Sequence, residues 1–208
     1  MTTSLANIDS LGAQDERIVR FLKRIHVSTY SDFIEVLYED LNCCVREIQD
    51  NAKYNQADAV GEDRITSNIK LILKTMMYNV ESQFSRGGNT DLTITSYNHL
   101  YKWIAEAKLV SSVDNTHIWG GFEQLTERYT SGTENQGGLL IYIMCENALN
   151  VMNSYRDYTK TKTQYKFTHE VCADLPAGGF FSIHKHTASG LDFKVRHIPF
   201  VMYYSPVK

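Results

Sequence analysis

The stretch Gly88 to Lys108, GNTDLTITSYNHLYKWIAEAK, decides the fold that we expect for this chain. Leu92 and Ile94 alternate with polar residues, which is typical of a strand that buries one face. A short polar connection leads to a second strand, Tyr101 to Val110, and both faces of this strand carry apolar residues. Such a strand belongs to the interior of a sheet. The sequence therefore predicts a hairpin whose second strand is central.

The register of this hairpin determines which polar side chains meet. A two-residue loop at Asn98-His99 would set Asp91 opposite Glu106, with Cβ atoms roughly 5 Å apart. Lys108 follows Glu106 by two residues and therefore points to the same face. A longer loop would shift the pairing by two residues, so the predicted register depends on the loop length.

Two opposed carboxylates destabilise a sheet unless something offsets their charge. Three possibilities are open: a raised pKa on one carboxylate, a salt bridge to Lys108, or a bound divalent cation. Oxygen ligands suit Mg²⁺ or Mn²⁺, and such a cation activates water and neutralises charge on a phosphodiester. A neighbouring lysine can stabilise the developing negative charge. The simpler interpretation of Asp91, Glu106 and Lys108 is a surface hairpin with a cross-strand salt bridge.

The elements around the hairpin predict an α/β (α+β) fold with a central mixed β-sheet flanked by helices. The predicted helices are Asp15 to Ile25, Ser31 to Asn51, Glu62 to Met77, Trp119 to Ser131 and Asn147 to Arg156. The other predicted strands are Tyr78 to Ser85, Thr90 to Ser96, Gly138 to Cys145, Tyr165 to Cys172, Gly179 to His186 and Leu191 to Tyr204. The apolar run that begins at Gly138 is of the kind found in the middle of a covered sheet.

The polar segment Lys53 to Ala59 interrupts the helical pattern and marks a soft boundary. We expect an N-terminal helical lead-in over residues 1–55 and the main domain over residues 56–208, in one compact unit. The pairs Gly120-Gly121 and Gly178-Gly179 are interpreted as turn elements.

Asp91, fourteen further residues and then Glu106-Ala107-Lys108 resemble the catalytic signature of the PD-(D/E)xK nuclease superfamily, which has the restriction-endonuclease-like fold. An amphipathic helix that opens near Glu62 and a later helix that carries Gln124 are similar to that family's pattern, and the resemblance covers about residues 61–145. In the exonuclease-like branch a tyrosine follows this glutamine at +4. Here position +4 is Arg128, and the tyrosine, Tyr129, stands at +5.

The resemblance implies a nuclease with Mg²⁺ (or Mn²⁺) as its cofactor. The implied metal ligands are Asp91, Glu106, Glu62 and the Ala107 carbonyl. Lys108 would position the attacking water and Gln124 would support the site, so that hydrolysis leaves a 5′-phosphate. For Glu62 the simpler interpretation is a first-turn acid that complements the helix dipole.

A net charge of −3 excludes a strongly basic coat that binds nucleic acid over the whole surface. A local basic rim suffices for the expected substrate, DNA rather than RNA, and its predicted members are Arg128, Lys185 and Arg196. His184 and His186, with His197 further on, suggest a metal site, but the H-x-H pair on one strand face does not specify a third ligand. We expect these histidines to be solvated or to face the substrate.

The 208-residue chain is 43% hydrophobic, which is enough for a folded core. No apolar stretch reaches the length of a membrane span, and residues 1–10 lack the pattern of a secretory signal. The four cysteines form no C-x-x-C pair, which favours reduced core thiols in a cytoplasmic protein.

These observations lead to the hypothesis of a metal-dependent nuclease in restriction or anti-phage defence. The expected partner is a second copy of the chain, as a homodimer, or a defence complex of which the protein is a subunit. The alternative is a non-catalytic nuclease-fold subunit that acts as a binding or assembly module. In that case the apolar side of the helix Ser31 to Asn51 would serve as an interface, although core packing would explain its apolar residues equally well.

Overall fold

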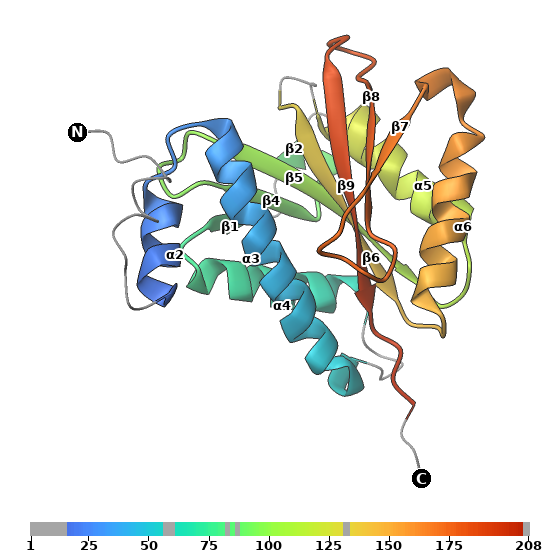
Figure 1. Cartoon of the computed structure of the whole chain (residues 1–208), viewed down its shortest axis with the longest axis horizontal. Coiled ribbons are helices and arrows are strands. Elements are labelled where there is room, and N and C mark those ends of the chain that lie inside the picture. The colour runs from blue at the N-terminus through green and yellow to red at the C-terminus, as the bar shows by residue number, and fades with distance from the viewer. Residues whose placement is uncertain (1–15, 56–60, 82–83, 86–87, 131–133, 206–208) are drawn as a thin grey trace.

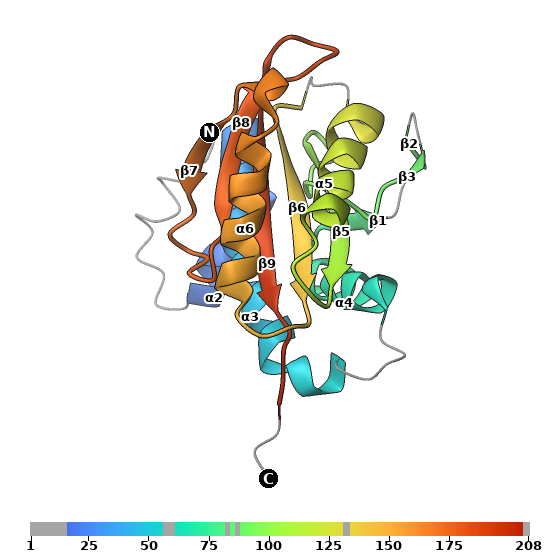
Figure 2. The same ribbon diagram turned by 90° about the vertical axis from the view of Figure 1, so that its right-hand side faces the viewer.

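The computed structural model describes residues 16–55, 61–81, 84–85, 88–130 and 134–205. Its centre is a seven-stranded mixed sheet (Figure 1). In spatial order the strands are β1 (Asn79–Glu81), β4 (Leu92–Thr95), β5 (Lys102–Val110), β6 (Gln136–Ile143), β9 (Asp192–Val201), β8 (Phe180–Lys185) and β7 (Thr168–Val171). The short strands β2 (Phe84–Ser85) and β3 (Gly88–Asn89) form a separate ribbon outside this sheet (Figure 2). The predicted α/β architecture is thus confirmed.

Helices cover both faces of the sheet (Figures 1 and 2). They are α2 (Glu16–Ile25), α3 (Tyr30–Asp50), α4 (Glu62–Thr75), α5 (Asn115–Glu123) and α6 (Ala148–Lys160). Short 3-10 helices span Ala52–Asn55 and Thr163–Tyr165, and a π-helix, Gln124–Tyr129, continues α5. None of the helices in the described part of the chain is both long and apolar enough to cross a membrane.

The strands β5, β6 and β9 run parallel in the middle of the sheet. Alternate residues of β5 supply two cores: Trp103 and Ala105 pack with α3 and α4, whereas Ile104 packs with α5 and α6. Every residue from Gly137 to Ile143 in β6 is buried, as predicted for a covered central strand. The site described below therefore stands on a rigid part of the molecule.

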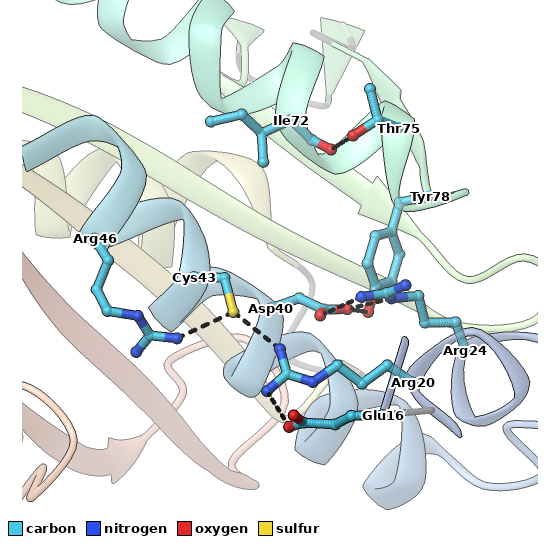
Figure 3. Close-up of polar contacts among 9 residues, drawn as sticks. All are labelled: Glu16, Arg20, Arg24, Asp40, Cys43, Arg46, Ile72, Thr75 and Tyr78. Carbon is cyan, nitrogen blue, oxygen red and sulfur yellow. Dashed lines mark hydrogen bonds and ion pairs between the residues drawn. The ribbon is translucent and has the colours of Figure 1, made fainter. Parts of the chain in front are cut away.

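Helix α2 buries none of its ten residues completely; Val19 and Leu22 pack against the core, and polar contacts also attach the helix (Figure 3). Arg24 donates two hydrogen bonds of 2.7 Å to the buried Asp40 of α3, and the Tyr78 hydroxyl donates a third of 2.8 Å. Arg20 donates to the Cys43 sulfur at 3.2 Å. Arg20 and Arg24 thus join α2 to α3, and Tyr78 joins α3 to the segment between α4 and β1.

Several predicted boundaries differ from the structure for local reasons. Helix α4 ends at Thr75 rather than at Met77, because Met77 adopts a left-handed backbone with φ 72°. The predicted strand Tyr78 to Ser85 is divided into β1 and β2, and residues 82–83 lie outside the described part. Positions 56–59 of the predicted boundary segment and position 131 of the predicted helix Trp119 to Ser131 also lie outside it.

The predictions for the two glycine pairs have different outcomes. Gly178 has φ +89° and lies in a turn, as predicted. The interpretation of Gly120-Gly121 as a turn element was wrong, because both residues lie inside α5. All four cysteines are free thiols; Cys44 and Cys172 are buried and the other two are half-buried.

Candidate active site

The hairpin of β4 and β5 has the predicted register. Thr95 lies opposite Lys102 and Thr93 lies opposite Ile104. The connecting loop is longer than the two residues assumed, because the last backbone bond joins Ser96 N to Tyr101 O at 2.9 Å. The loop therefore lengthens without shifting the pairing of the strands.

Strand β5 extends beyond its partner β4, and two carboxylates accept hydrogen bonds from the backbone edge that β4 leaves unpaired. Leu92, the first residue of β4, lies opposite Ala105, and the pairing of the two strands ends there. The Ala107 N–H then donates to Asp91 Oδ2 at 2.8 Å, and the Leu109 N–H donates to Glu62 Oε2 at 2.7 Å. Two of the predicted site residues are thus held at adjacent positions of one strand edge by backbone donors.

Glu106 and Lys108 lie on the face of β5 that α5 and the π-helix cover. Lys108 Nζ donates to Glu106 Oε1 at 2.7 Å, and the two residues are only 9% and 3% exposed, respectively. Glu106 Oε2 is buried and has no hydrogen-bond partner among the described residues. Burial raises the pKa of Glu106 to about 7; the Lys108 ammonium opposes this shift and the Asp91 carboxylate adds to it. Asp91 and Glu106 are therefore close neighbours.

Glu62 is in electrostatic contact with the same group of charges. Burial raises its pKa and Asp91 adds to the rise, whereas Lys108, the Leu109 N–H and His117 lower it. Sequence reasoning did not identify the contribution of Lys70, on α4. Burial lowers the pKa of Lys70, and the carboxylates of Asp91 and Asp63 oppose that shift, so a second ammonium interacts electrostatically with Asp91.

Helix α5 passes close to Lys108 because of a glycine. A Cβ atom at Gly121 would lie 2.7 Å from Lys108 Cγ and 3.0 Å from a methyl carbon of Leu139. Carbon atoms do not approach so closely, so a larger residue at position 121 would force the Lys108 side chain to move. Gly121, one of the pair that resembled a turn in the sequence, instead makes room for the predicted catalytic lysine.

The π-helix changes the position of one further side chain. Its i→i+5 pattern adds a residue to the turn, which moves Tyr129 toward the side of Gln124 compared with an α-helix. Burial raises the pKa of Tyr129, and the next causes are the carboxylates of Glu106 and Asp91. The signal in the sequence was the tyrosine at +5, but the helix type that makes this spacing effective was not predicted.

Gln124 and Lys108 line one hollow. The Gln124 side-chain oxygen is buried and has no partner among the described residues. Arg128 is exposed and lines the same hollow. The structure thus brings together Asp91, Glu106 and Lys108, with Glu62, Gln124 and Arg128 around them.

The residues present fit a divalent cation held by two carboxylates. Asp91 and Glu106 are neighbours, and the unpartnered Glu106 Oε2 is an available hard oxygen ligand. Mg²⁺ commonly binds through one or two carboxylates and completes its shell with water. Within the described ranges, no three His, Cys, Asp or Glu side chains are grouped as a metal site would require. Glu62 is thus not gathered with the other two, and its role as a ligand stays a prediction.

The predicted basic rim is only partly present. Lys185 is exposed but pairs with Asp192 at 2.9 Å, on the distant strands β8 and β9. The prediction for Arg196 was wrong, because this residue is 1% exposed. Its guanidinium lies 4.5 Å from the centre of the Tyr38 ring and donates to Asn42 Oδ1 at 2.7 Å, so Arg196 fastens α3 to β9 instead of meeting a phosphate.

The expectation of solvated or substrate-facing histidines was also wrong. His184, His186 and His197 are all buried, at 4% exposure or less. His186 shares a hydrogen bond with Thr130, and His197 shares one with Ser182. These histidines therefore belong to the interior of the protein.

No protein-family model matches this chain, and no curated protein or solved structure matches it either. The function must therefore be inferred from the side chains that the fold brings together.

Proposed function

We propose that this protein is a metal-dependent nuclease of the PD-(D/E)xK type that hydrolyses phosphodiester bonds in DNA. The observation that carries this proposal is the buried Glu106–Lys108 pair on a central strand, with Asp91 beside it. A cross-strand salt bridge on a surface hairpin would be solvated, and burial of such charges carries a desolvation penalty. An arrangement that keeps charges at such a cost is typical of a site that uses them.

Asp91 and Glu106 would hold the cation, and the Ala107 carbonyl lies on the strand edge that Asp91 occupies. When bound, the cation supplies an activated water and neutralises charge on the phosphate. Lys108 spends one of its three N–H donors on Glu106 and keeps the others to orient a water or to stabilise the developing negative charge. Gln124 and Tyr129 border these groups from the helical side.

Cleavage assays with purified protein test this proposal. DNA and RNA are incubated with Mg²⁺, with Mn²⁺ or with EDTA, and the ends of the products are analysed for a 5′-phosphate. We expect cation-dependent cleavage of DNA, and a loss of about 10²–10³-fold in kcat for Lys108→Ala, as for removal of a transition-state donor. The matched control is Lys185→Ala, on the far strands. Equal cleavage by the wild type and by Lys108→Ala would overturn the proposal.

The alternative, a non-catalytic binding or assembly subunit, has one observation in its favour. Asp91 and Glu62 already satisfy backbone donors of β5, which a purely structural role would also explain. The apolar side of α3 is not an interface, because Phe33, Leu37 and Leu41 are buried in the core. A role in restriction or anti-phage defence, as a homodimer or within a complex, remains a prediction.

A further inference from the structure

A hollow of about 660 Å³ opens beside Lys108, along the outer side of α5 and the π-helix. Its lining positions recur every three or four residues, so they form one face of these two helical segments. The residues that line it include His117, Gly120, Glu123, Gln124 and Arg128. The hollow therefore adjoins the candidate active site through the lysine that both share.

Gly120 faces open space in the wall of this hollow. Glycine is unfavourable inside a helix, and neither Gly120 nor Gly121 has the positive φ that would require it. The close approach of Lys108 explains why position 121 is a glycine, but a Cβ atom at Gly120 would meet nothing within 4 Å. A bare stretch of helix backbone allows another molecule to approach closely. Gly120 thus marks a place where a ligand fits against α5.

The side chains around Gly120 suit a nucleotide. Lys108 and Arg128 can contact phosphate oxygens, and the exposed ring of His117 offers a surface on which a base can stack. Glu123 and Gln124 can bond to the polar edge of a base. A purely apolar ligand would leave these groups unpaired, so the lining favours a polar occupant, with Lys108 and Arg128 as the groups that can meet a phosphate.

Two further acids at the hollow are already engaged. The Tyr165 hydroxyl donates to Glu127 at 2.8 Å. Asp114 caps α5 by accepting the His117 N–H at 2.9 Å. Their negative charge is therefore partly offset by these donors, which reduces their repulsion of a phosphate.

The size of the hollow distinguishes between paired and unpaired substrates. Cavities of about 300–1,000 Å³ take one drug-sized ligand, which is the size of a single nucleotide. A nucleotide stacked in a duplex cannot enter such a space without leaving the stack, and this step is easiest for an unpaired base. A hollow of this size therefore suits an unpaired nucleotide better than a base pair within an intact duplex.

We infer that the substrate of this site is single-stranded nucleic acid or a frayed end, with one unpaired nucleotide in the hollow at Gly120 and its phosphate at Lys108. This inference rests on the proposed nuclease function, since the hollow gains its role from the neighbouring catalytic groups.

The test compares a single-stranded oligonucleotide with its blunt duplex, at equal salt and with Mn²⁺. We expect the wild type to cleave the single strand with a kcat/KM at least about tenfold higher, because unpairing the duplex weakens its binding. Gly120→Leu places a bulky side chain in the hollow, and its Cβ atom meets no atom within 4 Å. For this variant we expect KM for the single strand to rise about tenfold while kcat changes little.

The matched control is Asn150→Leu, which places the same exposed leucine on α6, away from the hollow. Its KM should equal that of the wild type. The circular dichroism and melting temperature of both variants show whether each is folded.

Equal cleavage of the single strand and the duplex, or an unchanged KM in Gly120→Leu, would overturn the inference. If the wild type cleaves neither substrate, the proposed function fails, and the hollow is then tested by fluorescence anisotropy of the labelled single strand. Binding that Gly120→Leu weakens would support the nucleotide site on its own. Absence of binding by the folded wild type would overturn the inference as well.

Discussion

At the scale of single residues, Lys108 and Gly121 form one unit. The lysine side chain is held at one end by Glu106 and runs through the space that a side chain at position 121 would need. Its course is therefore determined by a residue on a different element. The distance between position 121 and the Lys108 side chain leaves no room for even one methyl group.

Gly121→Ala is predicted to separate stability from activity. Removal of a glycine from a helix stabilises it by about 0.5–1 kcal/mol, but here the new methyl group displaces Lys108 and offsets that gain. We expect a fall in kcat of at least about tenfold, because a small misplacement of a catalytic group is enough. Urea unfolding and single-turnover cleavage measure the two effects.

Gly120→Ala provides the control for the stability measurement. Its methyl group enters open space, so this variant should gain the full helix stabilisation of about 0.5–1 kcal/mol. A Gly121→Ala protein that is stabilised to the same extent and cleaves at the wild-type rate would contradict the conclusion that Gly121 makes room for the Lys108 side chain.

At the scale of elements, Arg196 joins a helix to a strand. It lies on β9 and donates to the Tyr38 carbonyl and to Asn42, both on α3. Cys172 also accepts a hydrogen bond from its guanidinium, at 3.4 Å. Arg128, in contrast, is exposed at the hollow beside Lys108. Both arginines were predicted to contact nucleic acid, but Arg196 is buried between two elements and only Arg128 is exposed at the hollow.

Alanine substitutions should separate these two roles. Arg196→Ala removes buried hydrogen bonds from a charged donor and leaves their acceptors unpaired, so we expect a loss of about 2–4 kcal/mol in the free energy of unfolding. Arg128→Ala should leave stability within about 0.5 kcal/mol and weaken nucleic-acid binding, with a shallower dependence on salt. Urea unfolding and binding titrations at several salt concentrations measure both effects. A stable Arg196→Ala protein with weakened binding would restore the original prediction for Arg196.

At the scale of the whole molecule, buried histidines link stability to pH. Burial lowers the pKa of His184 to about 4, with a smaller contribution from His186, and burial lowers the pKa of His197 well below its ordinary value. In the unfolded chain a histidine takes up its proton near pH 6.5. The unfolded state therefore binds more protons below that pH, and stability decreases as the pH falls.

The predicted effect is about 1.4 kcal/mol per pH unit below 6.5 for each such histidine. Glu106 opposes it, because a folded pKa of about 7 means that its proton uptake stabilises the folded state in part of the same range. The comparison of the wild type with His184→Phe removes this complication. Between pH 7 and pH 5 we expect the variant to lose about 1–2 kcal/mol less of its unfolding free energy in urea titrations. Parallel losses in the two proteins would contradict the buried, neutral state of His184.

Much of the fold follows from local pattern. The alternation in Leu92 to Ile94 and the continuous apolar run from Gly138 predicted a hairpin and a central strand, because side chains in a strand repeat with period two and a covered strand is apolar on both faces. The register that sets Asp91 near Glu106 was predicted for the same reason. These features depend on residues close together along the chain.

The sequence by itself determined the elements, the order of the site residues and the pairing of β4 with β5. Only the tertiary structure decided that Arg196 contacts Asn42, 154 residues away, and that His186 meets Thr130 across 56 residues. It likewise decided that Gly121 makes room for Lys108, and that a π-turn carries Tyr129 toward the carboxylates. The physical reason is that burial and contact depend on how elements pack across the sheet. A periodic pattern along one element does not specify which residues of other elements lie next to it.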